Sequence, residues 1–224
     1  MPSSTDAQLV AARCRQAGLD LHAITSVGRY NAAVTADVAL PGDASASVVV
    51  IGNTRAMWPH IDRFVRQSTT PVHDPVDTYV QQVIGRATAD IPRLIDIRYS
   101  HEPAPRLVAI QRLAHVAGMA WLSPSHLCVH PTFGPWIALR AAIVLGEPAP
   151  HPVPEPQPPC DCSMHCLPKL NEALAVGDAT SAEVVEHWKY WLAMRDACPV
   201  GRQHRYSDEQ IAYHYIGQRP SRWG

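Results

Sequence analysis

Long apolar runs and an excess of charge are both missing from this chain of 224 residues. The longest apolar runs, such as residues 47–52, suit a buried strand, whereas a membrane-spanning helix needs about 18 apolar residues. The N-terminus lacks a basic segment followed by an apolar one, so we expect no signal peptide and a cytoplasmic protein. The net charge of −1 argues against binding of nucleic acid by charge alone. We therefore expect neither a membrane nor a nucleic acid as a partner.

Several common catalytic motifs are also absent. The sequence contains no Walker loop, no Rossmann glycine fingerprint, no zinc-protease helix and no nucleophile elbow. At 46% hydrophobic residues the chain can bury a core, and at 17% charged residues it is not a disordered polymer. The length fits one ordinary domain with a short appendage.

Local signals predict an α+β fold. Helices are expected where apolar residues recur at helical spacing behind a capping residue, at residues 8–16, 56–66, 74–89, 106–121 and 182–197 and from residue 207. Strands are expected at residues 21–27, 46–51 and 95–100, and as a pair formed by residues 127–130 and 136–145. The turn of that pair is residues 131–135, which contain two prolines and a glycine.

Proline is the most unusual feature of the composition. Seven of the thirteen residues from Glu147 to Pro159 are proline, which excludes a helix or a central strand and predicts an extended polyproline II strap. We therefore divide the chain into an α+β body (residues 1–146), a proline-rich linker strap (147–159) and a C-terminal cap that contains cysteines (160–224).

Four cysteines of the cap are candidate metal ligands. Cys160, Cys162 and Cys166 are closely spaced, and Cys198 follows downstream. In a chain expected in the cytoplasm, such crowding favours metal or redox chemistry over disulfides. The spacing leaves three alternatives open: an iron–sulfur cluster, a zinc ion or thiols without a ligand.

Several motifs occur in the order found in one known family. They are Asp74-Pro-Val-Asp77, Ile84-Gly-Arg86, His115-Val-Ala-Gly118, the segment from Cys128 through Gly134-Pro135-Trp136 to Arg140, His187-Trp188, Arg195-Asp-Ala197 and Arg205-Tyr-Ser-Asp-Glu-Gln210. This ordered set resembles the cobalamin-processing proteins of the CblC (MMACHC) type.

The resemblance implies a fold and an activity. The fold would be flavin-reductase-like (nitroreductase-like), with a mixed sheet and flanking helices. The protein would bind cobalamin (vitamin B12) with its lower base detached and remove the upper axial ligand. Cyanide would leave by reduction with electrons from reduced flavin (FMN or FAD), and alkyl groups would pass to a small thiol such as glutathione. A homodimer formed on ligand binding is a further expectation.

The resemblance also assigns residues, although it identifies no catalytic residue. Its cobalamin contacts are His115, Ser125, His126, Cys128 and Leu139. Its thiol-binding residues are Arg140, Arg195 and Arg219, whose guanidinium groups would pair with the carboxylates of a tripeptide thiol. Plainer interpretations stay open for three of these residues: His115 as a core histidine, Cys128 as a small buried hydrophobe, and Arg195 as a packing or ion-pair residue.

Pro135 departs from the family pattern, which has glycine at this position. The sequence Gly134-Pro135-Trp136 resembles corrinoid reductases of the epoxyqueuosine reductase and reductive dehalogenase group, in which iron–sulfur modules follow. Two other functions therefore remain: a cobalamin-binding chaperone without turnover, and an iron–sulfur-containing corrinoid-dependent reductase. We expect Cys160, Cys162 and Cys166 to lie together at the mouth of the corrin cavity, with Cys198 as the fourth member.

Overall fold

The computed structural model describes residues 5–150, 154 and 156–223, which form two compact units. The described residues of 1–120 and 138–156 form the first, called the sheet unit below. Those of 121–137 and 157–224 form the second, called the helical unit. Residues 121–137 therefore group with the C-terminal part of the chain rather than with the body in which we expected them. No helix in the described part of the chain combines the length and hydropathy needed to cross a bilayer.

The sheet unit is built on four strands. In spatial order they are β1 (Leu21–Ser26), β2 (Ala46–Asn53), β6 (Ala138–Pro148) and β3 (Leu94–Tyr99). Each neighbouring pair is antiparallel, so the expectation of a mixed sheet is corrected for the described strands. The long strand β6 lies between β2 and β3, with Ile143 paired to Val49 on one side and to Ile97 on the other.

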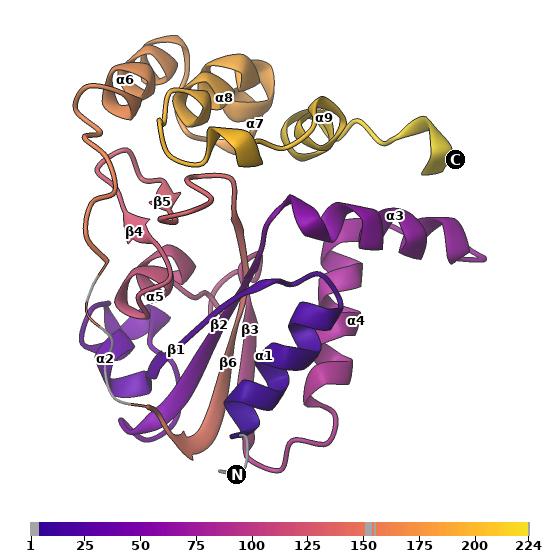
Figure 1. Ribbon diagram of the computed structural model, residues 1–224, viewed down its shortest axis with the longest axis vertical. Coiled ribbons are helices and arrows are strands. Elements are labelled where there is room, and N and C mark those ends of the chain that lie inside the picture. The colour runs from indigo at the N-terminus through magenta and orange to yellow at the C-terminus, as the bar shows by residue number, and fades with distance from the viewer. Residues whose placement is uncertain (1–4, 151–153, 155, 224) are drawn as a thin grey trace. The chain divides into compact units, whose positions relative to one another are not determined.

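Helices cover both faces of this sheet (Figure 1). The helices of this unit are α1 (Asp6–Gln16), α2 (Val27–Asn31), α3 (Trp58–Gln67), α4 (Pro75–Thr88) and α5 (Ile110–Val116). Helix α1 packs against α4 and the sheet, and α5 packs against α2, β2 and β6. Every residue of β2 is buried, which requires cover on both faces and explains its Val-Val-Val-Ile run.

The N-terminus of α1 is capped by a local side chain and by a distant one from β6. Thr5 and Gln8 form a capping box, in which the side chain of each accepts a hydrogen bond from the backbone N–H of the other. A threonine followed three residues later by a glutamine favours this arrangement. The buried carboxylate of Glu147, in β6, accepts hydrogen bonds from the backbone N–H groups of Asp6 (3.1 Å) and Ala7 (2.8 Å). A carboxylate at a helix N-terminus also interacts favourably with the helix dipole.

The helical unit contains short elements. They are β4 (Trp121–Leu122), β5 (Cys128–Val129), α6 (Cys166–Val176), α7 (Ser181–Glu186), α8 (Trp188–Asp196) and α9 (Asp208–Ile216). Short 3₁₀ turns complete the two units: η1 (Ala36–Val38), η2 (Arg55–Met57), η3 (Arg202–His204) and η4 (Ser221–Trp223). Helix α6 packs against α8 (Figure 1). A cluster of buried side chains lies within this unit.

The predicted strand pair of residues 127–130 and 136–145 is wrong. Strand β5 pairs with β4, whereas β6 pairs with β2 and β3. The physical reason is the turn between them: His130 and Gly134 exchange both backbone hydrogen bonds, at 2.9 and 2.8 Å. The chain therefore completes its turn at Gly134, before β6 begins at Ala138, and β5 and β6 do not pair with each other.

Helix predictions needed correction at several points. The helix expected at residues 106–121 is only α5, because Arg106 instead bonds to Asp96 and Glu102 beside β3, and Gly118 at φ +76° ends the helix. The helix expected at 182–197 divides into α7 and α8 at His187. Helix α6 was not predicted.

Two further expectations changed. The side chain of Asp74 makes no capping bond within the described residues, and its backbone carbonyl accepts from Thr78 instead. The proline-rich strap begins later than predicted, because Glu147 and Pro148 still belong to β6 and Ala149 donates to Ser45. Residues 151–153 and 155 of the strap lie outside the described residues.

Candidate functional site

Arg140 has a defined position in the sheet unit. It is half-buried in β6, and its Nε donates a hydrogen bond of 2.7 Å to Oδ1 of Asn53. Asn53 is fully buried at the end of β2, and its amide also donates to the Thr54 carbonyl at 2.8 Å. The amide therefore orients the planar guanidinium. Asn53 was not among the predicted site residues, although a polar residue at the end of a mostly apolar strand indicates a buried polar contact.

The two other predicted site residues of the sheet unit lie on neighbouring elements. His115 is half-buried in the last turn of α5, and Leu139 is half-buried in β6, where it pairs with Gly52. Helix α5, which carries His115, packs against β6, which carries Leu139. Neither is a fully buried core residue.

The segment from Ser125 to Cys128 forms a tight turn in the helical unit. Ser123 N–H donates to the Leu127 carbonyl, and the buried hydroxyls of Ser123 and Ser125 lie 2.8 Å apart. His126 is exposed at φ +61°, a left-handed backbone conformation that is uncommon outside glycine. Cys128 is buried in β5, so the structure places Ser125 and Cys128 inside this unit and His126 on its surface.

The turn that follows is held by the His130 side chain and by close backbone packing at Gly134. Nδ1 of His130 accepts hydrogen bonds from the N–H groups of Thr132 and Phe133, at 3.0 and 3.3 Å. Gly134 lies at φ +57°, and a Cβ added there would come within 1.9 Å of the Val200 carbonyl oxygen. Glycine is therefore required at this position for both conformation and space.

Arg195 is engaged by the backbone of its own unit. Its Nη2 donates to the carbonyl oxygens of Pro135 (2.7 Å) and Ile137 (3.3 Å). The guanidinium carbon lies 5.4 Å from the ring centroid of Trp136 and 5.9 Å from that of Tyr206. Its Nε is buried and has no hydrogen-bond partner among the described residues. Arg195 thus holds the segment that leads into β6, and one donor remains for a ligand.

Arg219 lies in a different environment. It is exposed, contacts the ring of Trp223 at 5.9 Å, and lines a pocket of about 410 Å³ together with Asp208 and Glu209. Those two carboxylates pair with Arg205 and Arg222, respectively.

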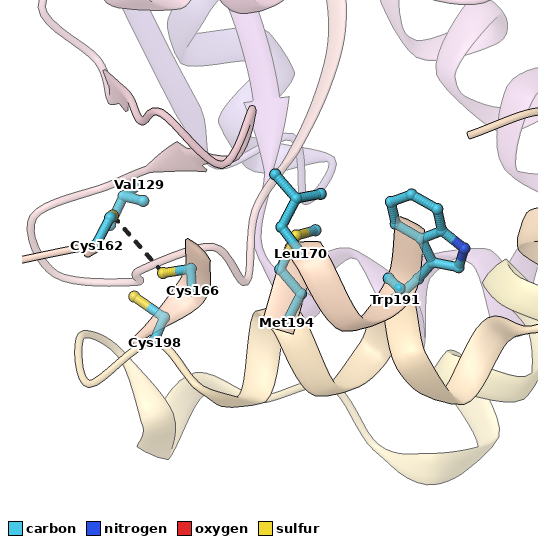
Figure 2. Packing of buried hydrophobic residues seen from close by; sticks show 8 residues of the cluster. Val129, Cys162, Cys166, Leu170, Trp191, Met194 and Cys198 are labelled. Atoms are coloured by element: carbon cyan, nitrogen blue, oxygen red, sulfur yellow. Dashed lines mark hydrogen bonds between the residues drawn. The ribbon is translucent and has the colours of Figure 1, made fainter. Parts of the chain in front are cut away.

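The four cysteines of the helical unit meet in its core (Figure 2). The Sγ atoms of Cys160 and Cys162 are 3.8 Å apart, and those of Cys162 and Cys166 are 3.7 Å apart. Cys198 forms a side-chain hydrogen bond with Cys166, and Figure 2 shows its sulfur turned toward Cys166. Three of the four are almost fully buried, and Cys160 is half-buried.

The thiols influence one another strongly. Hydrogen bonds with Cys198, then with Cys162 and Ser125, lower the pKa of Cys166 to about 6, although burial opposes this change. Burial, followed by the hydrogen bond with Cys166, raises the pKa of Cys162 to about 12. The hydrogen bond with Cys166 and burial raise the pKa of Cys198 above its usual range. The cluster therefore favours ionisation of one central thiol.

Among the described residues, side chains at the end of α7 form a group that could hold a metal ion, whereas no three of the four thiols lie mutually within 4.8 Å. The ligand atoms of Glu183, Glu186 and His187 lie within 4.8 Å of one another at the end of α7. Glu186 is exposed, and Glu183 forms an ion pair of 3.5 Å with His187. Exposed carboxylates form such groups commonly without a metal, and sequence analysis did not select them.

Comparison with known proteins identifies relatives. The model of the methylmalonic aciduria and homocystinuria type C family matches residues 18–223. Two similar proteins bear the name cyanocobalamin reductase / alkylcobalamin dealkylase. The bovine protein is 31% identical over 208 residues, which cover 84% of this chain and 70% of the relative. The human protein is 32% identical over 197 residues, which cover 78% of this chain and 64% of the relative.

Solved structures share the fold. The B12-trafficking protein CblC of C. elegans has a TM-score of 0.71 at 19% identity, with 97% of this chain and 94% of that chain covered. Epoxyqueuosine reductase from Bacillus subtilis has a TM-score of 0.53 at 11% identity, with 93% of this chain and 74% of that chain covered. The predicted α+β fold with a sheet and flanking helices is confirmed.

Proposed function

Because the chain belongs to the methylmalonic aciduria and homocystinuria type C family, we propose that it binds cobalamin and removes its upper axial ligand. The family match over residues 18–223 carries this proposal, since that range includes every residue predicted for the site. The names of the bovine and human relatives describe both decyanation and dealkylation, and we propose both reactions for this chain.

We assign cobalamin contacts to His115, Ser125, His126, Cys128 and Leu139. A corrin is large and mostly apolar, so it needs apolar walls with a few polar groups. The half-burial of His115 and Leu139 supports their assignment, because such side chains can contact a ligand without leaving the fold. We propose that the lower base detaches on binding.

For dealkylation we propose a thiol cosubstrate of the glutathione class. Its thiolate attacks the alkyl carbon, the cobalt–carbon bond breaks, and the bonding electron pair stays on cobalt, which becomes Co(I) while a thioether forms. Arg140 would bind a carboxylate of the thiol, because Asn53 holds its guanidinium in one orientation. Arg195 would donate from Nε. The assignment of Arg219 rests on the motif order alone.

For decyanation we propose one-electron reduction of Co(III) to Co(II) with departure of cyanide. Reduced flavin would supply the electron as a diffusing donor. The chain's own contribution is to bind cobalamin with the base detached, because loss of the lower ligand makes cobalt easier to reduce. We also propose that a homodimer forms when the ligand binds.

Visible spectroscopy tests this function directly. Purified full-length protein is mixed with methylcobalamin, and we expect the spectrum to shift to the base-off form. Addition of glutathione should then produce Co(I) and S-methyl glutathione, detected by mass spectrometry. Cyanocobalamin with reduced flavin under anaerobic conditions should yield Co(II) and free cyanide.

Two results would reject parts of the proposal. An unchanged spectrum together with no heat of binding in calorimetry would reject cobalamin as the ligand. A base-off shift with no turnover under either condition would instead support the chaperone function without catalysis. Light scattering before and after addition of cobalamin tests the dimer.

A further inference from the structure

Four thiols of the helical unit form a row that runs from its surface into its core. Cys160 is half-buried in the loop before α6, whereas Cys162, Cys166 and Cys198 are almost fully buried. Sulfur contacts of 3.8 Å and 3.7 Å join Cys160 to Cys162 and Cys162 to Cys166, respectively. A side-chain hydrogen bond then joins Cys166 to Cys198, which follows the end of α8 (Figure 2). Each of the two middle thiols therefore has a thiol neighbour on either side.

We propose that this row of thiols is a thiol–disulfide exchange site that reduces small-molecule disulfides. In such an exchange a thiolate attacks one sulfur of a disulfide and displaces the other sulfur, so the reacting groups must reach one another within the fold. Neighbouring sulfurs that are already in contact meet this requirement. Of the four thiols, the half-buried Cys160 gives a substrate the best access, and the reaction starts there.

The reaction at the surface end of the row consumes two thiols. The Cys160 thiolate attacks one sulfur of the substrate disulfide, forms a mixed disulfide and releases the first small thiolate. Cys162 then loses its proton and attacks the Cys160 sulfur, which releases the second small thiolate and leaves a Cys160–Cys162 disulfide. Two cysteines are oxidised, the substrate is reduced to two thiols, and the two cysteine protons balance those that the products take up.

The new disulfide then moves inward along the row. Cys166 attacks the Cys162 sulfur and frees Cys160, after which Cys198 attacks the Cys166 sulfur and frees Cys162. Each of these steps breaks one S–S bond and forms another, so no further oxidant is needed. The resulting Cys166–Cys198 disulfide leaves the two outer thiols ready for a second substrate molecule.

The surroundings of Cys166 favour the inward step. Cys166 is the first residue of α6, a helix of 11 residues, and the positive end of a helix dipole stabilises a thiolate. The Ser125 side chain hydrogen-bonds to the same sulfur, and Arg202 Nε donates to the Cys198 carbonyl at 3.3 Å, which brings positive charge near the row. The exchange uses no cobalamin, so it is independent of the proposed function.

Glutathione disulfide added to the reduced full-length protein, without cobalamin, tests this activity. One equivalent should release about two molecules of glutathione per chain, and an excess about four, with none left attached in the intact mass. Trypsin cuts after Arg140, Lys169, Arg195 and Arg202, so a Cys166–Cys198 disulfide joins peptides 141–169 and 196–202. After free thiols are blocked, we expect this cross-linked pair in the mass spectrum.

Substitutions of single thiols separate the steps. Cys160→Ser should slow glutathione release about 10-fold or more, because the remaining thiols of the row are buried. Cys162→Ser should stop after one released glutathione, with the other still attached to Cys160. Cys166→Ser should still release two but lose the cross-linked peptides. Cys14→Ala, which changes a buried free cysteine of the sheet unit, is the control and should react as wild type does.

Measurements on the wild-type protein decide the proposal even where a variant fails to fold. It is overturned if an excess of glutathione disulfide releases no glutathione, or if a mixed disulfide persists on the wild-type chain. A folded Cys160→Ser protein that reacts at the wild-type rate would also overturn it.

Discussion

Replacement of Arg195 by methionine should destabilise the helical unit by about 3–5 kcal/mol. The change keeps most of the side-chain volume but removes the donors to the carbonyls of Pro135 and Ile137. A hydrogen bond from a charged donor contributes about 1.5–3 kcal/mol, and the 2.7 Å bond to Pro135 belongs to this class. Pro135 and Ile137 are both buried. Loss of the guanidinium therefore leaves their carbonyl oxygens without a donor, and water cannot replace it.

The aromatic contacts of Arg195 add to this loss. The guanidinium lies near the rings of Trp136 and Tyr206, both of which are almost fully buried, and each cation–π contact contributes about 0.5–1 kcal/mol or more. Arg195→Lys keeps a charge but not the planar fork, so it should fall between methionine and wild type.

Urea unfolding followed by tryptophan fluorescence measures the effect. Five of the six tryptophans belong to the helical unit, so this signal reports mainly on the region that the change affects. Lys189→Met is the matched control, because Lys189 is an exposed residue of the same helix and loses only a surface cation–π contact with the half-buried Trp188, so stability should change by less than about 1 kcal/mol. An Arg195→Met protein within about 0.5 kcal/mol of wild type would refute the structural role assigned to Arg195.

Three further changes probe other parts of the chain. Arg140→Ala should raise the thiol concentration needed for dealkylation by about 10- to 150-fold, the equivalent of about 1.5–3 kcal/mol, while cobalamin affinity changes less; equal rates at limiting thiol would contradict this. Gly134→Ala should cost well over about 1 kcal/mol in thermal unfolding, because its Cβ meets the Val200 carbonyl, whereas Gly217→Ala at a similar φ meets nothing within 4 Å; equal costs would contradict the steric argument. Glu147→Ala should lower stability by about 1–2 kcal/mol through loss of its two bonds to the start of α1, and an unchanged urea midpoint would show that these bonds contribute little.

Local chemistry determined several elements directly. Thr5 and Gln8 have the side chains of a capping box at the required spacing, and the predicted helix behind them exists as α1. The Val-Val-Val-Ile run predicted a strand buried on both faces, and β2 is buried at every position. Ser207 caps α9 through the N–H of Gln210, as expected of its position. Such signals act within a few residues and need no tertiary partner.

The candidate residues were predictable, but their partners were not. The order of motifs selected Arg140 and Arg195, yet the amide that orients Arg140 lies 87 residues away at Asn53. The carbonyl acceptor of Arg195 at Pro135 lies 60 residues away. Both partners are common polar groups that matter here because they are buried and lie close to an arginine. A single sequence does not show which residues far apart along the chain come close together in the fold.

Tertiary structure alone decided which strands pair. An apolar pattern shows that residues 138–148 are buried, but it does not say against which neighbours, because any strand with a matching face satisfies the same pattern. Strand β6 lies between β2 and β3, where hydrogen bonds form along both of its edges, and β5 pairs with the short β4 in the other unit. Sequence determined the residue types at Cys160, Cys162, Cys166 and Cys198, whereas their contacts depend on the packing of α6 against α8.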